Sequence, residues 1–438
     1  MNKINIFLMC LVIGFIAPIP AYSMPDSLPG DSLTLNECVE IALKNSHEIA
    51  IASGNVNKAE ISVRDAYSGF LPDLYLSGGY NVNKDYDRFE WNENHYDLSI
   101  SSSITPFASG KTLLNVARST ASLSSSKQSY RITETSLILD VIRKYYNLLQ
   151  ASELLELRKE SIFQKRKDLE FAQAHFDLGL APKADILKAD VAVVSAQVDS
   201  LQAEGDLKLA RSELNDAMGI SLDNSTRIKP VEFIKEEVPD PDTCLMVALR
   251  ERPEILQQKS NLSTQKNNLR LAQIDRAPTF TITGSYNVYA EGFAFERLPI
   301  NRANWNENTD WRVNVGLSFP IFDGGVKSRA IESARIDLNN AELNYLELEK
   351  KINLEVKLAI LNSVTSSKKV ELTEKQVNSA EESYNMALGR YKAGVAPITE
   401  VIDAGVVLSS SKVNHTKTIY DYLLAKAVLK KSMGGLPY

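Results

Sequence analysis

Two carboxylates near the C-terminal end are spaced to act together. Glu400 and Asp403 follow Pro397 and lie three residues apart, which places them one turn from each other on one face of a helix. Paired acids attract cations and can bind divalent metal ions, above all where several copies meet in a ring. Acids in the first turn of a helix equally complement its dipole. The two residues alone leave both roles open.

The rest of the chain lacks the motifs of enzymes. It contains no Gly-x-Ser-x-Gly elbow, no phosphate-binding loop and no Cys-His metal spacing, and its 4 His are scattered. The net charge of -6 argues against a nucleic-acid partner, which would require a basic surface. We therefore expect a protein that is not an enzyme, with no catalytic residues, no cofactor and no metal site of its own.

Residues 1–23 are typical of a secretory signal peptide. Lys3 supplies the positive charge, an apolar stretch follows, and Ala21 and Ser23 frame a cleavage site of small residues. Export to an oxidising compartment would allow Cys38 and Cys244 to form a disulfide. Two buried free thiols are the alternative and the expected state.

The sequence contains an internal repeat. A segment around Gly179 recurs 215 residues later around Gly394, and upstream positions, Cys38 and Cys244 among them, recur 206 residues apart. Two copies of one unit indicate an architecture with internal two-fold pseudo-symmetry. The predicted division is a signal peptide at 1–23, repeat 1 at 24–219, a connector at 220–243 and repeat 2 at 244–438.

Four segments alternate apolar and polar residues, as strands with one apolar face do. Each is about ten residues long, which is enough to cross a bilayer when tilted. One apolar and one polar face would suit a water-filled barrel in lipid, and all 3 Trp lie in or beside these segments. The pattern alone would equally suit a soluble sandwich with one wet face. The expected strands span about 73–83, 95–105, 279–289 and 310–319.

The predicted long helices distinguish the membrane-barrel hypothesis from the soluble-sandwich hypothesis. Residues 111–178 and 326–388 contain no Gly or Pro and are rich in good helix formers, so each predicts a helix about 100 Å long. Such a helix must stand out as a rod or join a bundle. Breaks are expected at Gly205 and Gly405 in the returning helices. The expected helices span about 47–70, 111–178, 183–217, 254–277, 326–390 and 398–431.

Four strands cannot close a barrel, and open sheet edges are not tolerated in lipid. Several chains must therefore pool their strands. Eight strands from two chains would be filled by side chains, whereas twelve strands from three chains begin to leave a lumen. The fold class that we predict is mainly α, with four strands per chain contributed to a transmembrane β-barrel.

Three sequence features occur in order and with the spacing of a known family. They are the Pro-strand-Gly-x-Tyr segments, the stretch Pro320-Ile321-Phe322-Asp323-Gly324-Gly325 before the second long helix, and the tip residues Tyr391, Gly394, Glu400 and Asp403. With them, the chain after the signal peptide resembles the TolC family of outer-membrane efflux and secretion channels.

The resemblance implies a homotrimer with a twelve-stranded barrel in the outer-membrane lipid and a twelve-helix tunnel in the periplasm. It implies the exit channel of a tripartite efflux or type I secretion system. Such a channel passively conducts substrate from an inner-membrane pump, which could be of the RND, ABC or MFS type. The substrate arrives through a periplasmic adaptor, also called a membrane fusion protein.

The resemblance also assigns roles to residues at the tips. It implies that Glu400 and Asp403 line the pore constriction and that Tyr391 and Asp185 form a closed-state tie. A second family tie is absent, because this chain has Ala396 where the family has a basic residue. The residues implied to contact the adaptor are Gly179, Leu180, Ala181, Gly394, Val395 and Ala396.

One alternative from another class also explains the rods. A periplasmic coiled-coil adaptor, or a structural protein of an envelope complex, would contain long helical hairpins. It would carry compact β domains rather than two pairs of amphipathic strands with Trp at their ends. Outer-membrane fractionation separates the two classes.

Overall fold

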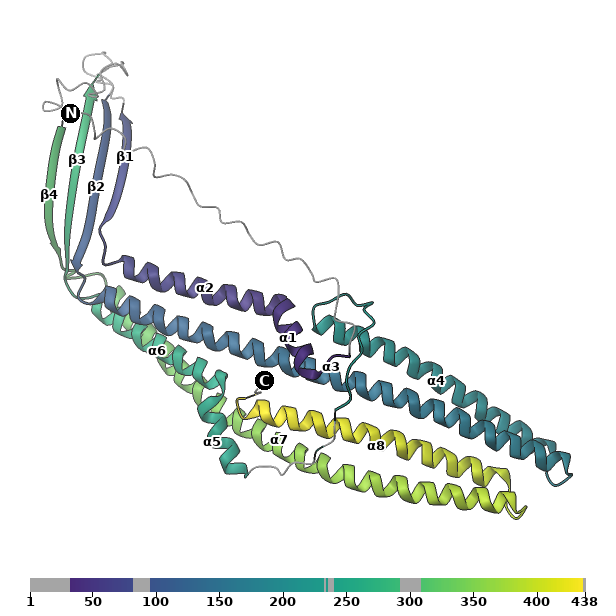
Figure 1. Ribbon diagram of the computed structural model, residues 1–438. Helices are drawn as coiled ribbons and strands as arrows, with labels where there is room; N and C mark the ends of the chain where they lie inside the picture. The colour runs from purple at the N-terminus through teal and green to yellow at the C-terminus, as the bar shows by residue number, and fades with distance from the viewer. Residues whose placement is uncertain (1–31, 82–94, 232–233, 235–239, 292–308, 436–438) are drawn as a thin grey trace.

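The computed structural model describes residues 32–81, 95–231, 234, 240–291 and 309–435 (Figure 1). The expected signal peptide lies outside these residues. The elements are α1 (Leu35–Asn45), α2 (His47–Ser68), β1 (Asp73–Asn81), β2 (His95–Phe107), α3 (Lys111–Asp177), α4 (Lys183–Ala217), α5 (Pro241–Glu251), α6 (Pro253–Ile274), β3 (Thr279–Glu291), β4 (Thr309–Ser318), α7 (Val326–Lys392) and α8 (Ile398–Ser432).

The molecule is elongated, with the strands at one end and two helical hairpins at the other (Figure 1). The helices α3 and α7 contain 67 residues each. The first packs along α4 and the second along α8, while α3 also contacts α8 and so joins the two hairpins. The mainly α fold expected from the long stretches without Gly or Pro is confirmed. Among the described residues, no helix combines the length and apolar character needed to cross a membrane.

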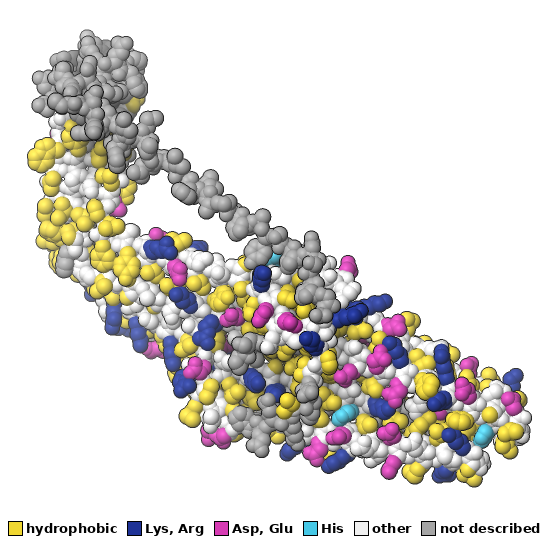
Figure 2. Space-filling view, in the orientation of Figure 1, with side chains coloured by type: hydrophobic (Ala, Val, Ile, Leu, Met, Phe, Trp, Pro, Cys, Tyr) yellow, Lys and Arg dark blue, Asp and Glu magenta, His cyan; other side chains and the backbone are white. Residues whose placement is uncertain are grey.

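The strands form one antiparallel sheet in the order β1-β2-β3-β4. The register aligns Leu76 with Ile100, Ile100 with Tyr286, and Tyr286 with Trp311, so one row of large apolar side chains crosses all four strands. All four side chains are exposed in the single chain. Figure 2 shows hydrophobic side chains over the strands, with most charged side chains on the helices. The sheet thus presents an apolar face without a covering layer of its own.

A carboxylate begins the second long helix. Asp323 accepts hydrogen bonds from the backbone N–H groups of Lys327 and Gly325, both at 2.9 Å. These bonds, that of Lys327 first, hold the pKa of Asp323 below its ordinary value. Gly324 and Gly325 have φ angles of 66° and 82°, which side chains with a Cβ rarely adopt. The Asp-Gly-Gly sequence is therefore a helix start, which explains its place before α7.

Apolar clusters hold the helices together at separate levels. The largest lies where α1 meets α3, α4 and α8, around the buried Tyr145. Its hydroxyl donates to the carbonyl oxygens of Lys229 at 2.6 Å and Leu33 at 3.3 Å. Tyr145 therefore ties the connector and the N-terminal segment to the long helix. Cys38 and Cys244 are both buried thiols rather than a disulfide, as expected.

The expected breaks at Gly205 and Gly405 are wrong. Both α4 and α8 continue through these residues as uninterrupted helices. Packing rather than a break in the backbone explains the glycine at position 405, because a Cβ there would overlap the ammonium group of Lys165. The glycine makes room for a side chain from the neighbouring hairpin.

Candidate functional site

Each hairpin reverses through the same backbone motif. Gly179 and Gly394 adopt left-handed φ angles of 73° and 70° just after the long helices. The next amides bond back across the helix end, Leu180 to the carbonyl of His175 at 2.8 Å and Val395 to that of Arg390 at 3.1 Å. This pattern is the Schellman motif, which ends a helix with a glycine in the left-handed region. The two expected tips are thus rigid turns built in the same way.

The tips expose apolar side chains. Leu178 is 72% exposed, and Leu180 and Val395 are each 68% exposed. Most of the surface of each of these side chains therefore faces solvent in the single chain.

The two carboxylates of the expected constriction differ in their surroundings. Glu400 is half-buried in the first turn of α8, and its carboxylate lies 3.5 Å from the guanidinium of Arg390. Asp403 is exposed one turn later, on the same helix. Arg390 therefore offsets part of the charge of Glu400, whereas the Asp403 carboxylate stays in solvent. Asp403 is the more exposed of the two acids, and within the chain its charge acts on the buried ammonium of Lys165.

The acids of one chain do not gather into a metal site among the described residues. Across the part of the chain that the structure describes, no group of three or more His, Cys, Asp or Glu side chains is placed to hold a metal ion. Cation binding by Glu400 and Asp403 would therefore require copies of these acids from several chains.

Tyr391 lies in the core of the tip rather than on its surface. It is 2% exposed and stacks on the His175 ring, with 4.7 Å between the ring centroids and 18° between the planes. Its buried hydroxyl makes no hydrogen bond to a described residue. Burial raises the pKa of Tyr391, and the nearby charge of Asp185 adds to the effect. The expected pair is thus brought near but is not joined by a hydrogen bond.

The two basic residues beside Tyr391 are both engaged. Arg390 pairs with Glu400, and the Lys392 ammonium lies 4.3 Å from the centroid of the Phe171 ring. Because Phe171 belongs to α3 and Lys392 to α7, this cation–π contact also links the two hairpins near their tips.

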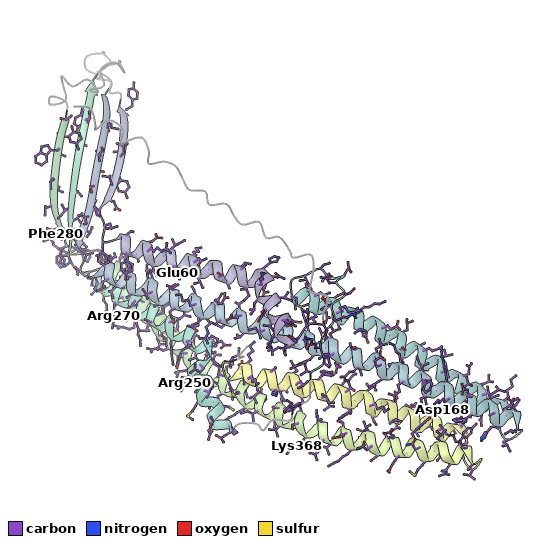
Figure 3. All side chains as sticks on the ribbon, viewed as in Figure 1. Glu60, Asp168, Arg250, Arg270, Phe280 and Lys368 are labelled. Atoms are coloured by element: carbon purple, nitrogen blue, oxygen red, sulfur yellow. The ribbon has the colours of Figure 1, made fainter. Side chains whose placement is uncertain are left out.

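A buried ionic cluster near the tips was missed by sequence reasoning. Asp168 is 1% exposed and accepts a 2.8 Å hydrogen bond from the hydroxyl of Tyr384. Its other oxygen lies 3.8 Å from the ammonium of Lys165, which is 5% exposed and donates to the carbonyl of Ile402 at 3.4 Å. Figure 3 labels Asp168 toward the tips, far from Phe280 at the base of the sheet. In sequence, Lys165 and Asp168 have the spacing of a solvated surface pair.

Burial dominates the electrostatics of this cluster. It lowers the pKa of Lys165, and the charges of Asp168 and Asp403 oppose that change. It raises the pKa of Asp168, against the hydrogen bond from Tyr384 and the charge of Lys165. The carboxylate and the ammonium each offset the cost of burying the other. Removing either one would leave a buried charge without its partner.

Comparison with known proteins places these features in a family. The family model described as outer membrane efflux protein matches residues 38–220 and 245–435. The outer membrane protein TolC of Vibrio cholerae is 22% identical over 404 residues, covering 92% of this chain and 91% of the relative. Toxin and drug export protein A of Aggregatibacter actinomycetemcomitans is 22% identical over 413 residues, covering 92% and 86%.

Solved structures share the fold. The outer membrane protein VceC of Vibrio cholerae aligns with a TM-score of 0.80 and 18% identity, covering 92% of this chain and 96% of that one. The open state of the MtrE outer membrane channel of Neisseria gonorrhoeae aligns with a TM-score of 0.78 and 17% identity, covering 95% and 98%.

Proposed function

Because this chain belongs to the outer membrane efflux protein family, we propose that it is the exit channel of a tripartite efflux or type I secretion system. Members of the family are outer-membrane channels rather than enzymes. The observation that carries the proposal is the two-part architecture, in which an amphipathic sheet is joined to hairpins of 67-residue helices. The sheet would lie in the outer membrane and the hairpins would extend into the periplasm.

The channel would be a homotrimer. The sheet leaves β1 and β4 as edges, and twelve strands from three chains would close them into a barrel with a lumen. The helices supply a second argument, because α4 exposes an apolar stripe at helical spacing and α7 exposes another. The members of the α4 stripe are Leu187, Val191, Val194, Val198 and Leu201, and those of the α7 stripe are Leu343, Leu346, Leu354, Leu358, Leu361 and Leu372.

The internal repeat indicates which helices of neighbouring chains would bring the stripes into contact. A shift of 215 residues takes α3 to α7 and α4 to α8. The contact of α3 with α8 inside one chain would therefore be repeated as a contact of α7 with α4 of the next copy. A ring of three chains would cover the exposed stripes of α4 and α7 with one another.

The tips would meet the periplasmic adaptor, which would pass substrate from an inner-membrane pump. Their support is the exposure of Leu180 and Val395 on rigid turns. The exposed Leu178 and Leu180 at one tip and Val395 at the other suit a partner that also presents short apolar turns. Inside the ring of tips, three copies of Glu400 and Asp403 would gather at the constriction.

The proposal predicts conduction by an assembly of three chains. Protein purified in detergent should be a trimer by light scattering, and the same fraction should produce conductance steps in planar lipid bilayers. A monodisperse monomer with intact strand content would rule out the trimer. A trimer that inserts into bilayers without conducting would rule out the channel.

A further inference from the structure

The turn of α8 that carries Asp403 is held from the neighbouring hairpin. Lys165 of α3 donates a hydrogen bond to the carbonyl of Ile402, the residue before Asp403. Two residues further, Gly405 packs so closely on the Lys165 ammonium that a Cβ would overlap it. The buried side chain of Lys165 thus contacts α8 on both sides of Asp403 in the sequence.

Two further residues hold Lys165 in place. The Asp168 carboxylate lies one turn along α3 and 3.8 Å from the ammonium, and it accepts the 2.8 Å hydrogen bond from Tyr384 of α7. Tyr384 also packs near Gly405. The cluster therefore connects α3 to both helices of the second hairpin, at a level close to the tips.

The cluster breaks the internal symmetry of the chain. A shift of 215 residues takes Lys165 to Ala380 and Asp168 to Ser383, and it relates Gly405 to Asp190 and Tyr384 to Leu169. None of these counterparts can form an ion pair in the same arrangement. The connection is thus built at one seam, between α3 and the second hairpin, and not at the seam related to it by the repeat.

We propose that Lys165, supported by Asp168 and Tyr384, is a positioning residue for the constriction that fixes the Asp403 turn of α8 against α3. The proposal rests on the channel function proposed above. Lys165 does not touch the permeating substrate, because it is buried. Its effect is to set where the Asp403 carboxylate stands and how easily the second hairpin moves.

The bond from Lys165 to Ile402 resists movement of the Asp403 turn. Any widening that moves the Asp403 turn away from α3 must break this bond and leave a buried ammonium with one partner fewer. At 3.4 Å the bond itself is long, so the cost arises mainly from leaving a buried charge with one partner fewer. The contact therefore favours the arrangement in the structure over one in which the Asp403 turn lies further from α3.

Two variants disturb the contact by different routes. Lys165→Met removes the charge and the hydrogen bond while keeping an unbranched side chain. Gly405→Ala keeps every charge and places a methyl group where the ammonium lies, so that the flexible lysine must shift. Gly389→Ala is the matched control, because a Cβ at that position of α7 would meet no neighbour within 4 Å.

Resting conductance in planar bilayers is the readout. Lys165→Met and Gly405→Ala should each raise the open population about tenfold, the change that about 1.4 kcal/mol of lost stabilisation produces. Gly389→Ala should match the parent. Circular dichroism and light scattering verify that each variant remains a folded trimer, and Gly405→Ala keeps the test available if Lys165→Met does not fold.

A double variant separates positioning from stability. Lys165→Met alone leaves the Asp168 carboxylate buried without its partner, so the thermal midpoint should fall. Lys165→Met with Asp168→Asn removes both charges, so the midpoint should recover, while conductance stays raised because the bond to Ile402 is still missing. Recovery of both quantities together would overturn the positioning role.

The outcomes distinguish this inference from the channel proposal. If the parent trimer inserts but does not conduct, the proposed function fails. If the parent conducts and both single variants show its resting conductance, the channel stands and the role of Lys165 is wrong.

Discussion

At the residue scale, the tip contains charged side chains at its surface and a stacked aromatic pair in its core. The acids expected from spacing do lie on one turn of α8, with Glu400 offset by Arg390 and Asp403 exposed. Tyr391 instead acts through its ring, which stacks on His175 in a buried position. Sequence indicated the acids because helical spacing alone places them together. It could not indicate the stack, since His175 and Tyr391 are 216 residues apart.

Substitutions at Tyr391 can distinguish a role of its stacked ring from a role of its hydroxyl. Tyr391→Phe should conduct like the parent at rest, because the ring remains and the hydroxyl makes no hydrogen bond to a described residue. Tyr391→Ala should raise resting conductance by removing the stack. Planar-bilayer recordings measure both. Raised conductance in Tyr391→Phe would show that the hydroxyl does form the closed-state tie, with Asp185 as the natural partner.

The lowered pKa of Asp323 predicts that its contribution to thermal stability depends on pH. Its pKa is below the ordinary value in the folded chain, so its stabilisation is present above that value and is lost as the pH falls through the lowered pKa. Asp323→Ala should therefore melt earlier than the parent at pH 7, and the gap should close below about pH 4. Circular dichroism melts at several pH values measure this.

Asp337 supplies the control for that experiment. It is exposed within α7, away from the helix start. Asp337→Ala should leave the melting midpoint close to that of the parent across the same pH range. A gap between Asp323→Ala and the parent that persists unchanged to pH 3 would contradict the capping role.

At the element scale, much of the fold followed from simple patterns. The long helices were predictable because nothing within residues 111–178 or 326–388 interrupts a helix, and the strands because apolar residues alternate. The packing reason for Gly405 was not predictable, because the Lys165 ammonium that lies against it belongs to a helix distant in sequence. The short helices α1 and α5, of 11 residues each, were not among the predicted ranges, although their apolar and polar faces are more distinct than those of the long helices.

The sheet predicts opposite responses on its two faces. Leu98 lies in register with Gly78 and Val288 on the apolar face, whereas Ser99 lies in register with Ser77 and Asn287 on the polar face. Leu98→Arg should cost about 2–4 kcal/mol if the site is near the bilayer midplane, and Ser99→Arg should be mild. Urea unfolding in lipid vesicles measures both. Equal costs would show that the apolar face does not meet lipid.

At the scale of the whole molecule, a duplicated chain makes most sense as one third of a ring. The exposed stripes on α4 and α7, the unpaired edges of β1 and β4, and the paired tips all require neighbours. The ring would contain six seams in alternation, three within chains and three between chains. Only the seam within a chain carries the Lys165 cluster, so the two kinds of seam should differ in stiffness.

The most direct measurement is one-sided cation block of the reconstituted channel. The account predicts that divalent or trivalent cations added on the side of the tips block the parent, because three copies of Glu400 and Asp403 concentrate negative charge there. Glu400→Gln with Asp403→Asn should remain a folded trimer, lose the block and prefer cations less. Full block and full cation preference in this double variant would contradict the account, because the two acids would then only complement the dipole of α8.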